Sequence, residues 1–198
     1  MASISFARGA PSPECLDPAL LSGCAAAALE ADGVTILSYG SGGGYGPLRE
    51  HLAERHGVAP GRVFVTTGGL QGFVFYAAVQ LARRPGRVVV EAPTYDRPLK
   101  LLGWDGVEVA TVPLVEEGLD LEALEQELGR GGPVSFLYTI PTFQNPSGIT
   151  ASRASREALY ALAERLDLVV IEDDPYGEVY FDDAVPPPAP IAALGDAG

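Results

Sequence analysis

A carboxylate and a phenol that could bind a charged aromatic ligand stand three residues apart, at Asp173 and Tyr176. They belong to the segment EDDPY at 172–176, which directly follows the apolar run LVVI at 168–171. A carboxylate leaving a buried strand can pair with a cationic ring nitrogen, and the tyrosine could donate to a phenolate-type oxygen. Asp173 could instead cap a helix before a proline turn, or it could bind magnesium together with Asp174, although no phosphate-loop lysine motif accompanies the pair.

A second polar segment, PTFQNPSG at 141–148, follows the apolar run 134–138. Its amide residue, Asn145, lies between two prolines that restrict the backbone around it. A side-chain amide held in this way can donate a hydrogen bond to a ligand oxygen. A turn-forming asparagine is the structural alternative.

Two further segments could hold a phosphate and a flat ring. TGGLQG at 67–72 joins a predicted strand to a predicted helix, and the free N–H groups at a helix start bind anions when glycine lets the backbone approach. Tyr95 follows the strand-like run 87–91 and could stack on a ring. A glycine turn without a ligand and a tyrosine packed in the core are the structural alternatives at these two places.

The elements that must position these residues alternate between apolar strand-like runs and longer helical patterns. The predicted strands are Arg62–Thr67, Arg87–Glu91, Val107–Val112, Val134–Tyr138 and Leu168–Glu172. The predicted helices are Pro18–Ala31, Leu48–His56, Gln71–Arg83, Asp96–Leu102, Asp120–Leu128 and Ser152–Leu166. This alternation predicts an α/β fold of three layers, α/β/α, with a mostly parallel sheet covered on both faces. Ligands bind such sheets at the carboxyl ends of the strands, which is where the candidate residues lie.

Composition narrows the range of partners and sites. The formal net charge of −13 disfavours nucleic acid and anionic membrane surfaces, since both need clustered Lys and Arg. No apolar run approaches the roughly 18–20 residues of a membrane span, and the N-terminus shows no signal peptide. Cys15 and Cys24 lack metal-ligand spacing and are typical of reduced thiols in a cytoplasmic protein. His51 and His56 lie on a charged helix face, so no metal site is expected.

In this order, the segments resemble the large domain of the fold-type I enzymes that use pyridoxal 5'-phosphate (PLP). The similarity is strongest to class I/II aminotransferases of the aminoadipate, valine–pyruvate and regulator-associated types, and it runs from about residue 4 to about residue 183. PTFQNPSG at 141–148 is the most specific match, and EDDPY at 172–176 follows at the expected distance. The start, with ISF at 4–6 and PSP at 11–13, is similar to the N-terminal arm of the family.

The resemblance implies a role for each residue that would surround the cofactor ring. Asp173 would pair with the protonated ring nitrogen, and Tyr95 would stack on the ring. Asn145 and Tyr176 would form hydrogen bonds with its phenolic oxygen.

The resemblance also implies the residues that would bind the phosphate and the substrate. Gly69, Leu70 and Gln71 would hold the cofactor phosphate through backbone N–H groups and the amide side chain. Tyr39 would reach the phosphate in the partner subunit of a homodimer. Gly9 would lie near the carboxylate of the substrate.

The family needs a lysine that this chain does not place at a matching position. In the family, a lysine forms a Schiff base with PLP and moves the proton between substrate and cofactor. It lies in a Ser-rich stretch after the segment that EDDPY matches. The single lysine here, Lys100, lies on the helix after Tyr95 and matches no catalytic position. We therefore expect no catalytic residue in this chain, and we expect the chain alone to be an inactive N-terminal fragment.

The resemblance divides the chain into three parts. Residues 1–46 would form the N-terminal arm, a helix and a Gly-rich turn; residues 47–183 a partial PLP-binding large domain; and residues 184–198 a Pro-rich tail or linker. The C-terminal small domain is expected to be absent and the sheet to be incomplete, because the last two strands of the family's seven-stranded sheet insert between the first and the fifth. The predicted strand 62–67 would then lack a neighbour on the side of 168–172.

The implied activity is PLP-dependent transfer of an amino group between an amino acid and a 2-oxo acid, in amino acid metabolism and biosynthesis. The implied protein is a cytoplasmic homodimer with neither a nucleic-acid nor a membrane partner. A PLP-dependent lyase or decarboxylase would share the same cofactor-binding residues. The chain could also be a non-catalytic remnant, or it could be the effector domain of a transcription regulator, which would need an upstream winged-helix segment.

Overall fold

The computed structural model describes residues 11–195 and contains a five-stranded sheet in the order β3-β2-β1-β4-β5. The central strands β1 (Arg87–Ala92) and β4 (Val134–Thr139) pair in parallel, and β2 (Val109–Val115) and β5 (Val170–Glu172) flank them, also in parallel. A two-residue strand, β3 (Gly118–Leu119), pairs antiparallel with β2. The predicted α/β fold with a mostly parallel sheet is therefore confirmed.

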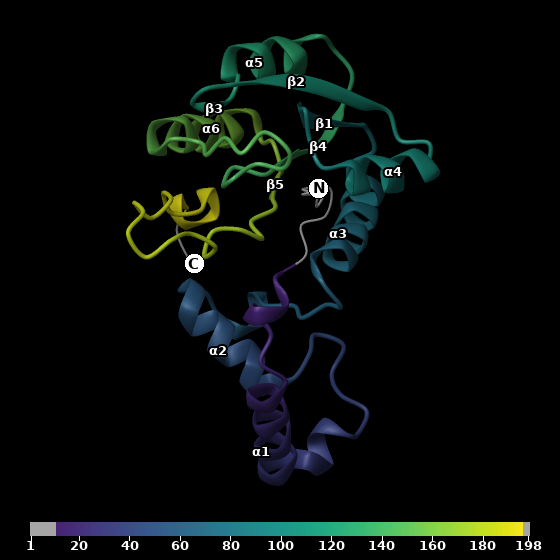
Figure 1. Ribbon diagram of the computed structural model, residues 1–198. Helices are drawn as coiled ribbons and strands as arrows, with labels where there is room; N and C mark the ends of the chain where they lie inside the picture. The colour runs from purple at the N-terminus through teal and green to yellow at the C-terminus, as the bar shows by residue number, and fades with distance from the viewer. Residues whose placement is uncertain (1–10, 196–198) are drawn as a thin grey trace, which may run out of the picture.

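Helices cover both faces of this sheet (Figure 1). On one face lie α3 (Gly69–Arg83) and α4 (Asp96–Trp104), and on the other lie α5 (Leu121–Gly129) and α6 (Arg153–Leu166). All four form within a few residues of the predicted bounds.

The alternation of side chains along the strands explains the two layers of core. In β1, Val88 and Val90 point toward α3 and α4 and pack with Phe136 of β4, whereas Val89 points to the opposite face. Val89 packs there with Leu137, and with residues of α5 and α6. These strands are buried on both faces, which is why they read as nearly continuous apolar runs.

The N-terminal helices α1 (Pro18–Ile36) and α2 (Gly46–His56) extend away from the sheet (Figure 1). No residue of α1 is buried, and the helix continues past the predicted end at Ala31, with non-helical backbone at Asp32. By length and composition alone, Pro13–Ile36 is apolar enough to cross a membrane, with a hydropathy of 1.3, contrary to the expectation from the sequence. Apolar core helices and signal sequences meet the same criterion.

The predicted strand Arg62–Thr67 is wrong. A short 3-10 helix, Pro60–Arg62, is followed by extended backbone that pairs with no strand in the described part of the chain. Its contacts come from the Gly-rich turn and from α2 instead: the Val65 N–H donates to the Gly43 carbonyl (3.0 Å), and Arg49 Nε donates to the Val63 carbonyl (2.8 Å). A strand requires backbone pairing with a neighbouring strand, and within residues 11–195 no strand pairs with this segment.

The tail predicted as a loop or linker is irregular at 186–190 but then docks onto the sheet domain. A 3-10 helix, Ile191–Leu194, places Ile191 in the core beside Leu159 and Leu162 of α6. The Ile191 and Ala192 N–H groups donate to the Glu172 carboxylate at 2.9 and 3.0 Å. This part of the tail is therefore packed against the fold.

Candidate functional site

A cavity of about 640 Å³ at the carboxyl ends of β1, β4 and β5 brings together six of the predicted site residues. They are Gly69, Leu70, Tyr95, Asn145, Asp173 and Tyr176. The remaining wall is largely aromatic and apolar, with Phe73, Tyr76 and Ile140 among its residues. An apolar cavity with a few convergent polar groups is typical of a small-molecule site.

Asp173 is held at the end of β5 by contacts to β4. Its N–H donates to the Thr139 carbonyl (2.9 Å), and its Oδ2 accepts a hydrogen bond from the Tyr138 hydroxyl (2.6 Å). No helix begins between residues 173 and 183, so the helix-cap alternative does not apply. Within residues 11–195 there is also no group of three or more His, Cys, Asp or Glu side chains placed to hold a metal. Asp173 lines the cavity, so its carboxylate is positioned for a ligand there.

Tyr138 is a site residue that the sequence analysis treated only as part of a strand. It is 1% exposed, and its ring packs edge-on against Phe73 at a centroid distance of 5.4 Å. Burial, followed by the hydrogen bond to Asp173, raises the pKa of Tyr138 far above its usual value, so its hydroxyl remains a neutral donor. The available signal was its position near the end of a buried strand, where a tyrosine hydroxyl needs a partner.

A buried carboxylate, Glu91, joins the two loops that carry Tyr95 and Asn145. Its oxygens accept hydrogen bonds from Thr139 Oγ1 (2.7 Å), the Ile140 N–H (3.1 Å) and Gln144 Nε2 (2.8 Å). Gln144 Nε2 also donates to the Pro93 carbonyl (2.8 Å), which fixes the loop before Tyr95. Burial raises the pKa of Glu91, against the effect of these hydrogen bonds.

A buried guanidinium, Arg156 of α6, supports the same region from the opposite face of the sheet. It donates to the Pro141 carbonyl (2.9 Å) and to Thr142 Oγ1 (2.9 Å), at the start of the loop that carries Asn145. It also lies 3.7 Å from Glu172 Oε1, next to Asp173 in the chain. Burial lowers the pKa of Arg156 and raises the pKa of Glu172. Neither residue was expected at the site from the sequence.

The start of α3 forms the edge of the cavity through Gly69 and Leu70. The first N–H groups of a helix have no partner within it, so they are available to an anion. Gln71 does not line the cavity, and its Oε1 accepts a hydrogen bond from the Thr67 N–H (2.8 Å). Its side chain thus folds back onto the segment before the helix, and its predicted role at a phosphate stays a prediction.

Three other residues considered in the sequence lie elsewhere. Tyr39 is fully exposed in the loop after α1 and does not line the cavity. Gly9 lies outside the described residues. Lys100 lies on α4, where it pairs with Asp96 on the surface, and it does not line the cavity.

Together, these groups suit a flat cationic ring that carries an oxygen substituent and a phosphate. Tyr95 offers a ring face, Asp173 a carboxylate held from behind, and Asn145 and Tyr176 hydrogen-bonding groups. The N–H groups at the start of α3 offer an anion site. Residues from the ends of three strands and one helix thus provide complementary groups for one ligand.

A model of the family described as aminotransferase class I and II matches residues 8–196. The 2-aminoadipate transaminase of Thermus thermophilus is 40% identical over 181 residues, which are 91% of this chain and 45% of that protein. Aromatic-amino-acid aminotransferase 1 of Thermococcus litoralis is 35% identical and covers 98% of this chain and 48% of its own length. The chain thus spans about half the length of the curated relatives it matches.

Among solved structures, α-aminoadipate aminotransferase LysN from Thermus thermophilus, complexed with N-(5'-phosphopyridoxyl)-L-leucine, superposes with a TM-score of 0.85. It is 38% identical, and the match covers 96% of this chain and 48% of LysN. Because the match covers 96% of this chain, the unmatched residues are fewer than the 19 residues of α1. Much of this apolar helix therefore lies within the fold that the two proteins share. An HTH-type transcriptional regulator of Bacillus subtilis, YisV, is also similar, with 29% identity over 84% of this chain and 34% of its own length.

Proposed function

This chain belongs to the aminotransferase class I and II family, and from that membership we propose that its protein transfers an amino group between an amino acid and a 2-oxo acid. Pyridoxal phosphate is the cofactor of this family, as expected from the sequence. The observation that carries the proposal is the convergence of Tyr95, Asn145, Asp173 and the start of α3 on one cavity.

The residues of this chain would bind and orient the cofactor. When bound, pyridoxal phosphate supplies an electron sink for the charge that remains on an amino-acid Cα after its proton is removed. Asp173 would keep the ring nitrogen protonated, because a carboxylate beside it favours the cationic form. Tyr95 would hold the ring plane, and Asn145 and Tyr176 would hold its phenolic oxygen.

We also propose that the 198-residue chain does not complete the reaction by itself. No lysine lines the cavity, and the side chain of Lys100 pairs with Asp96 on the outer surface of α4. The amine that moves the substrate proton would then come from a part of the protein outside residues 11–195. The homodimer and the cytoplasmic location expected from the sequence stay predictions.

The proposal can be tested on this chain with pyridoxamine 5'-phosphate, the amine form of the cofactor, which forms no Schiff base with lysine. We expect the chain to bind it, and Asp173→Asn to raise the dissociation constant at least about tenfold, since the charge-assisted pair is lost. The control is Asp174→Asn, because Asp174 is adjacent, exposed and outside the cavity. Equal affinities for the three proteins would contradict the proposed site.

In a protein of the relatives' full length, Asp173→Ala should reduce transaminase turnover by orders of magnitude, because the ring nitrogen loses the carboxylate that keeps it protonated. Turnover near the unsubstituted level would rule out the assigned role of Asp173.

A second candidate is an effector domain of a transcription regulator, which the similarity to YisV supports. Both candidates use the same cavity for the cofactor. They differ in the fate of an added amino acid: an aminotransferase releases the corresponding 2-oxo acid, whereas an effector domain only needs to bind. Measuring the 2-oxo acid formed by the full-length protein separates them.

A further inference from the structure

We infer that Tyr138 is a positioning residue for the cofactor ring nitrogen: its hydroxyl holds one oxygen of the Asp173 carboxylate so that the other faces the cavity. The inference rests on the proposed function, and it assigns a task to a residue with no expected role.

The backbone fixes the two side chains relative to each other. Tyr138 lies opposite Ile171 in the parallel pairing of β4 with β5, and the pairing continues through the hydrogen bond from the Asp173 N–H to the Thr139 carbonyl (2.9 Å). Tyr138 lines the cavity beside Asp173, and its hydroxyl meets Asp173 Oδ2 at 2.6 Å. Within residues 11–195, Asp173 Oδ1 has no hydrogen-bond partner.

Packing alone does not require this hydroxyl. The ring of Tyr138 contacts Phe73 and the apolar layer beneath α3, and a phenylalanine would make the same contacts. A buried hydroxyl without a partner is costly, whereas one that donates to a carboxylate is stabilising. Asp173 is the partner that makes a tyrosine suitable here.

The charged and titratable groups that face the hydroxyl favour its donor role. Burial raises the pKa of the phenol most, and Asp173 after β5, Glu91 on β1 and Tyr95 after β1 add to that effect. The phenol can then only donate to the carboxylate. A carboxylate held in this way loses less rotational freedom when it pairs with a ring N–H.

The test compares two ligands that differ only in the ring nitrogen: pyridoxamine 5'-phosphate and its 1-deaza analogue, in which carbon replaces that nitrogen. Dissociation constants are measured for the full chain, Tyr138→Phe, Asp173→Asn and the double variant. Tyr160→Phe is the control, because Tyr160 lies on α6 and packs against the opposite core layer. Thermal unfolding checks that each variant remains folded.

We expect Tyr138→Phe to weaken pyridoxamine 5'-phosphate about tenfold and the deaza analogue less than about twofold, because only the first ligand can use the Asp173 pair. In the Asp173→Asn background, Tyr138→Phe should have little further effect, since coupled residues are not additive. Tyr160→Phe should change neither affinity.

Equal losses for the two ligands, or additive losses in the double variant, would overturn the positioning role and leave the cofactor site intact. If the unsubstituted chain binds neither ligand, the cofactor site itself is wrong, and the role of Tyr138 with it. The two failures are thus distinguishable.

Discussion

Glu91 is a buried carboxylate that connects two loops of the site without lining the cavity. It is 1% exposed, and each of its hydrogen-bond partners acts as a donor. Two of these partners, the Ile140 N–H and Gln144 Nε2, share Oε1, whereas Thr139 Oγ1 donates to Oε2. Because a threonine hydroxyl can also accept, a glutamine could replace Glu91 with its amide N–H₂ directed at Thr139.

The substitution Glu91→Gln should therefore preserve the fold and change its dependence on pH. Burial raises the pKa of Glu91, so the folded chain holds that proton more tightly than the unfolded chain. Its stabilising contribution is complete below the unfolded pKa and is lost as the pH rises through the folded pKa. The free energy of unfolding of Glu91→Gln, relative to that of the unsubstituted chain, should therefore be higher at about pH 8 than at about pH 5. Urea unfolding at the two pH values measures this difference.

The exposed Glu116→Gln provides the control, since this side chain lies in a surface turn. Glu172, whose pKa burial also raises, is present in both proteins and cancels in the comparison. A difference in stability that is the same at both pH values would show that the raised pKa of Glu91 does not contribute.

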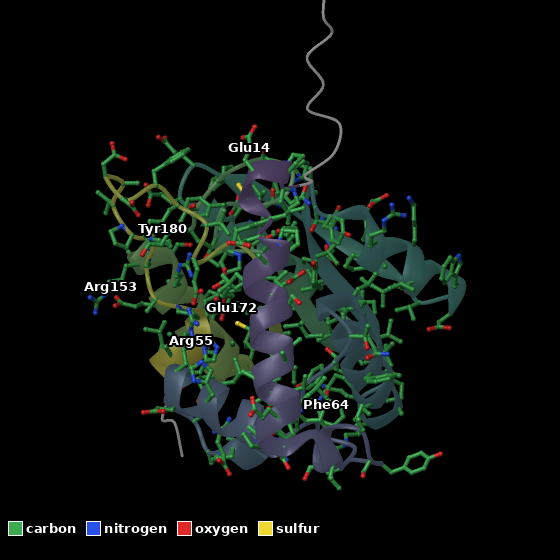
Figure 2. The ribbon with its side chains drawn as sticks, turned by 60° about the horizontal axis from the view of Figure 1, so that its bottom comes forward. Glu14, Arg55, Phe64, Arg153, Glu172 and Tyr180 are labelled. Carbon is green, nitrogen blue, oxygen red and sulfur yellow. The ribbon has the colours of Figure 1, made fainter. Side chains whose placement is uncertain are left out.

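Arg156 connects three segments that are distant in the sequence. From α6 it reaches the loop after β4, the end of β5 at Glu172, and the tail, where Nη1 donates to the Ala189 carbonyl (3.3 Å). In Figure 2, Arg153 projects from the edge of the molecule, and its side chain is 82% exposed, whereas the side chain of Arg156 on the same helix is 1% exposed. The two arginines of α6 thus have opposite environments.

Replacing Arg156 with alanine should destabilise the fold by about 3 kcal/mol, because it leaves Glu172 buried without its cation and several carbonyls without a donor. Urea unfolding measures this loss, and limited proteolysis should show faster cleavage of the tail near 184–190. Arg153→Ala, which removes an exposed pair with Glu157, should leave both unchanged. Similar effects of the two substitutions would exclude a supporting role for Arg156.

The sequence predicted an element correctly where neighbouring strands and helices bury its apolar side chains. The runs 87–91 and 134–138 became strands that are buried between helices on both faces of the sheet, and residues 170–172 of the run 168–172 pair with β4. The run 62–67 has the same composition but remains unpaired, since a strand also requires a neighbour that its own sequence does not specify. The docking of Ile191 was missed for a related reason: it depends on Glu172, 19 positions earlier.

The sequence likewise predicted some residues of the site and missed others. The convergence of Asp173, Asn145 and Tyr95 on one cavity was predictable because groups at the ends of neighbouring parallel strands meet at one edge of the sheet. Tyr138, Glu91 and Arg156 were missed because their roles come from contacts between segments, with partners 35, 53 and 33 positions away. Local patterns therefore identify the residues that line the cavity better than the residues that hold them in place.

The chain exposes many large apolar side chains that its own fold does not cover. Leu20, Leu21 and Val34 on α1 are 62%, 65% and 86% exposed, and β5 leaves one edge of the sheet unpaired. Exposed apolar patches and free strand edges promote association. The acidic net charge of −13 opposes this by repulsion between copies, so the outcome depends on ionic strength.

We therefore predict that the isolated chain self-associates at physiological salt, with a light-scattering mass above 20.7 kDa that rises with protein concentration. Replacing Leu20 and Leu21 with serine should lower that mass and leave the melting temperature almost unchanged, because neither side chain is buried within the chain. Trp104→Ser, at a single exposed position on α4, should not lower it, since it leaves α1 intact. A cooperative monomer of 20.7 kDa at all concentrations would show that charge repulsion outweighs the apolar surface of α1, and that the five-stranded fold needs no further partner.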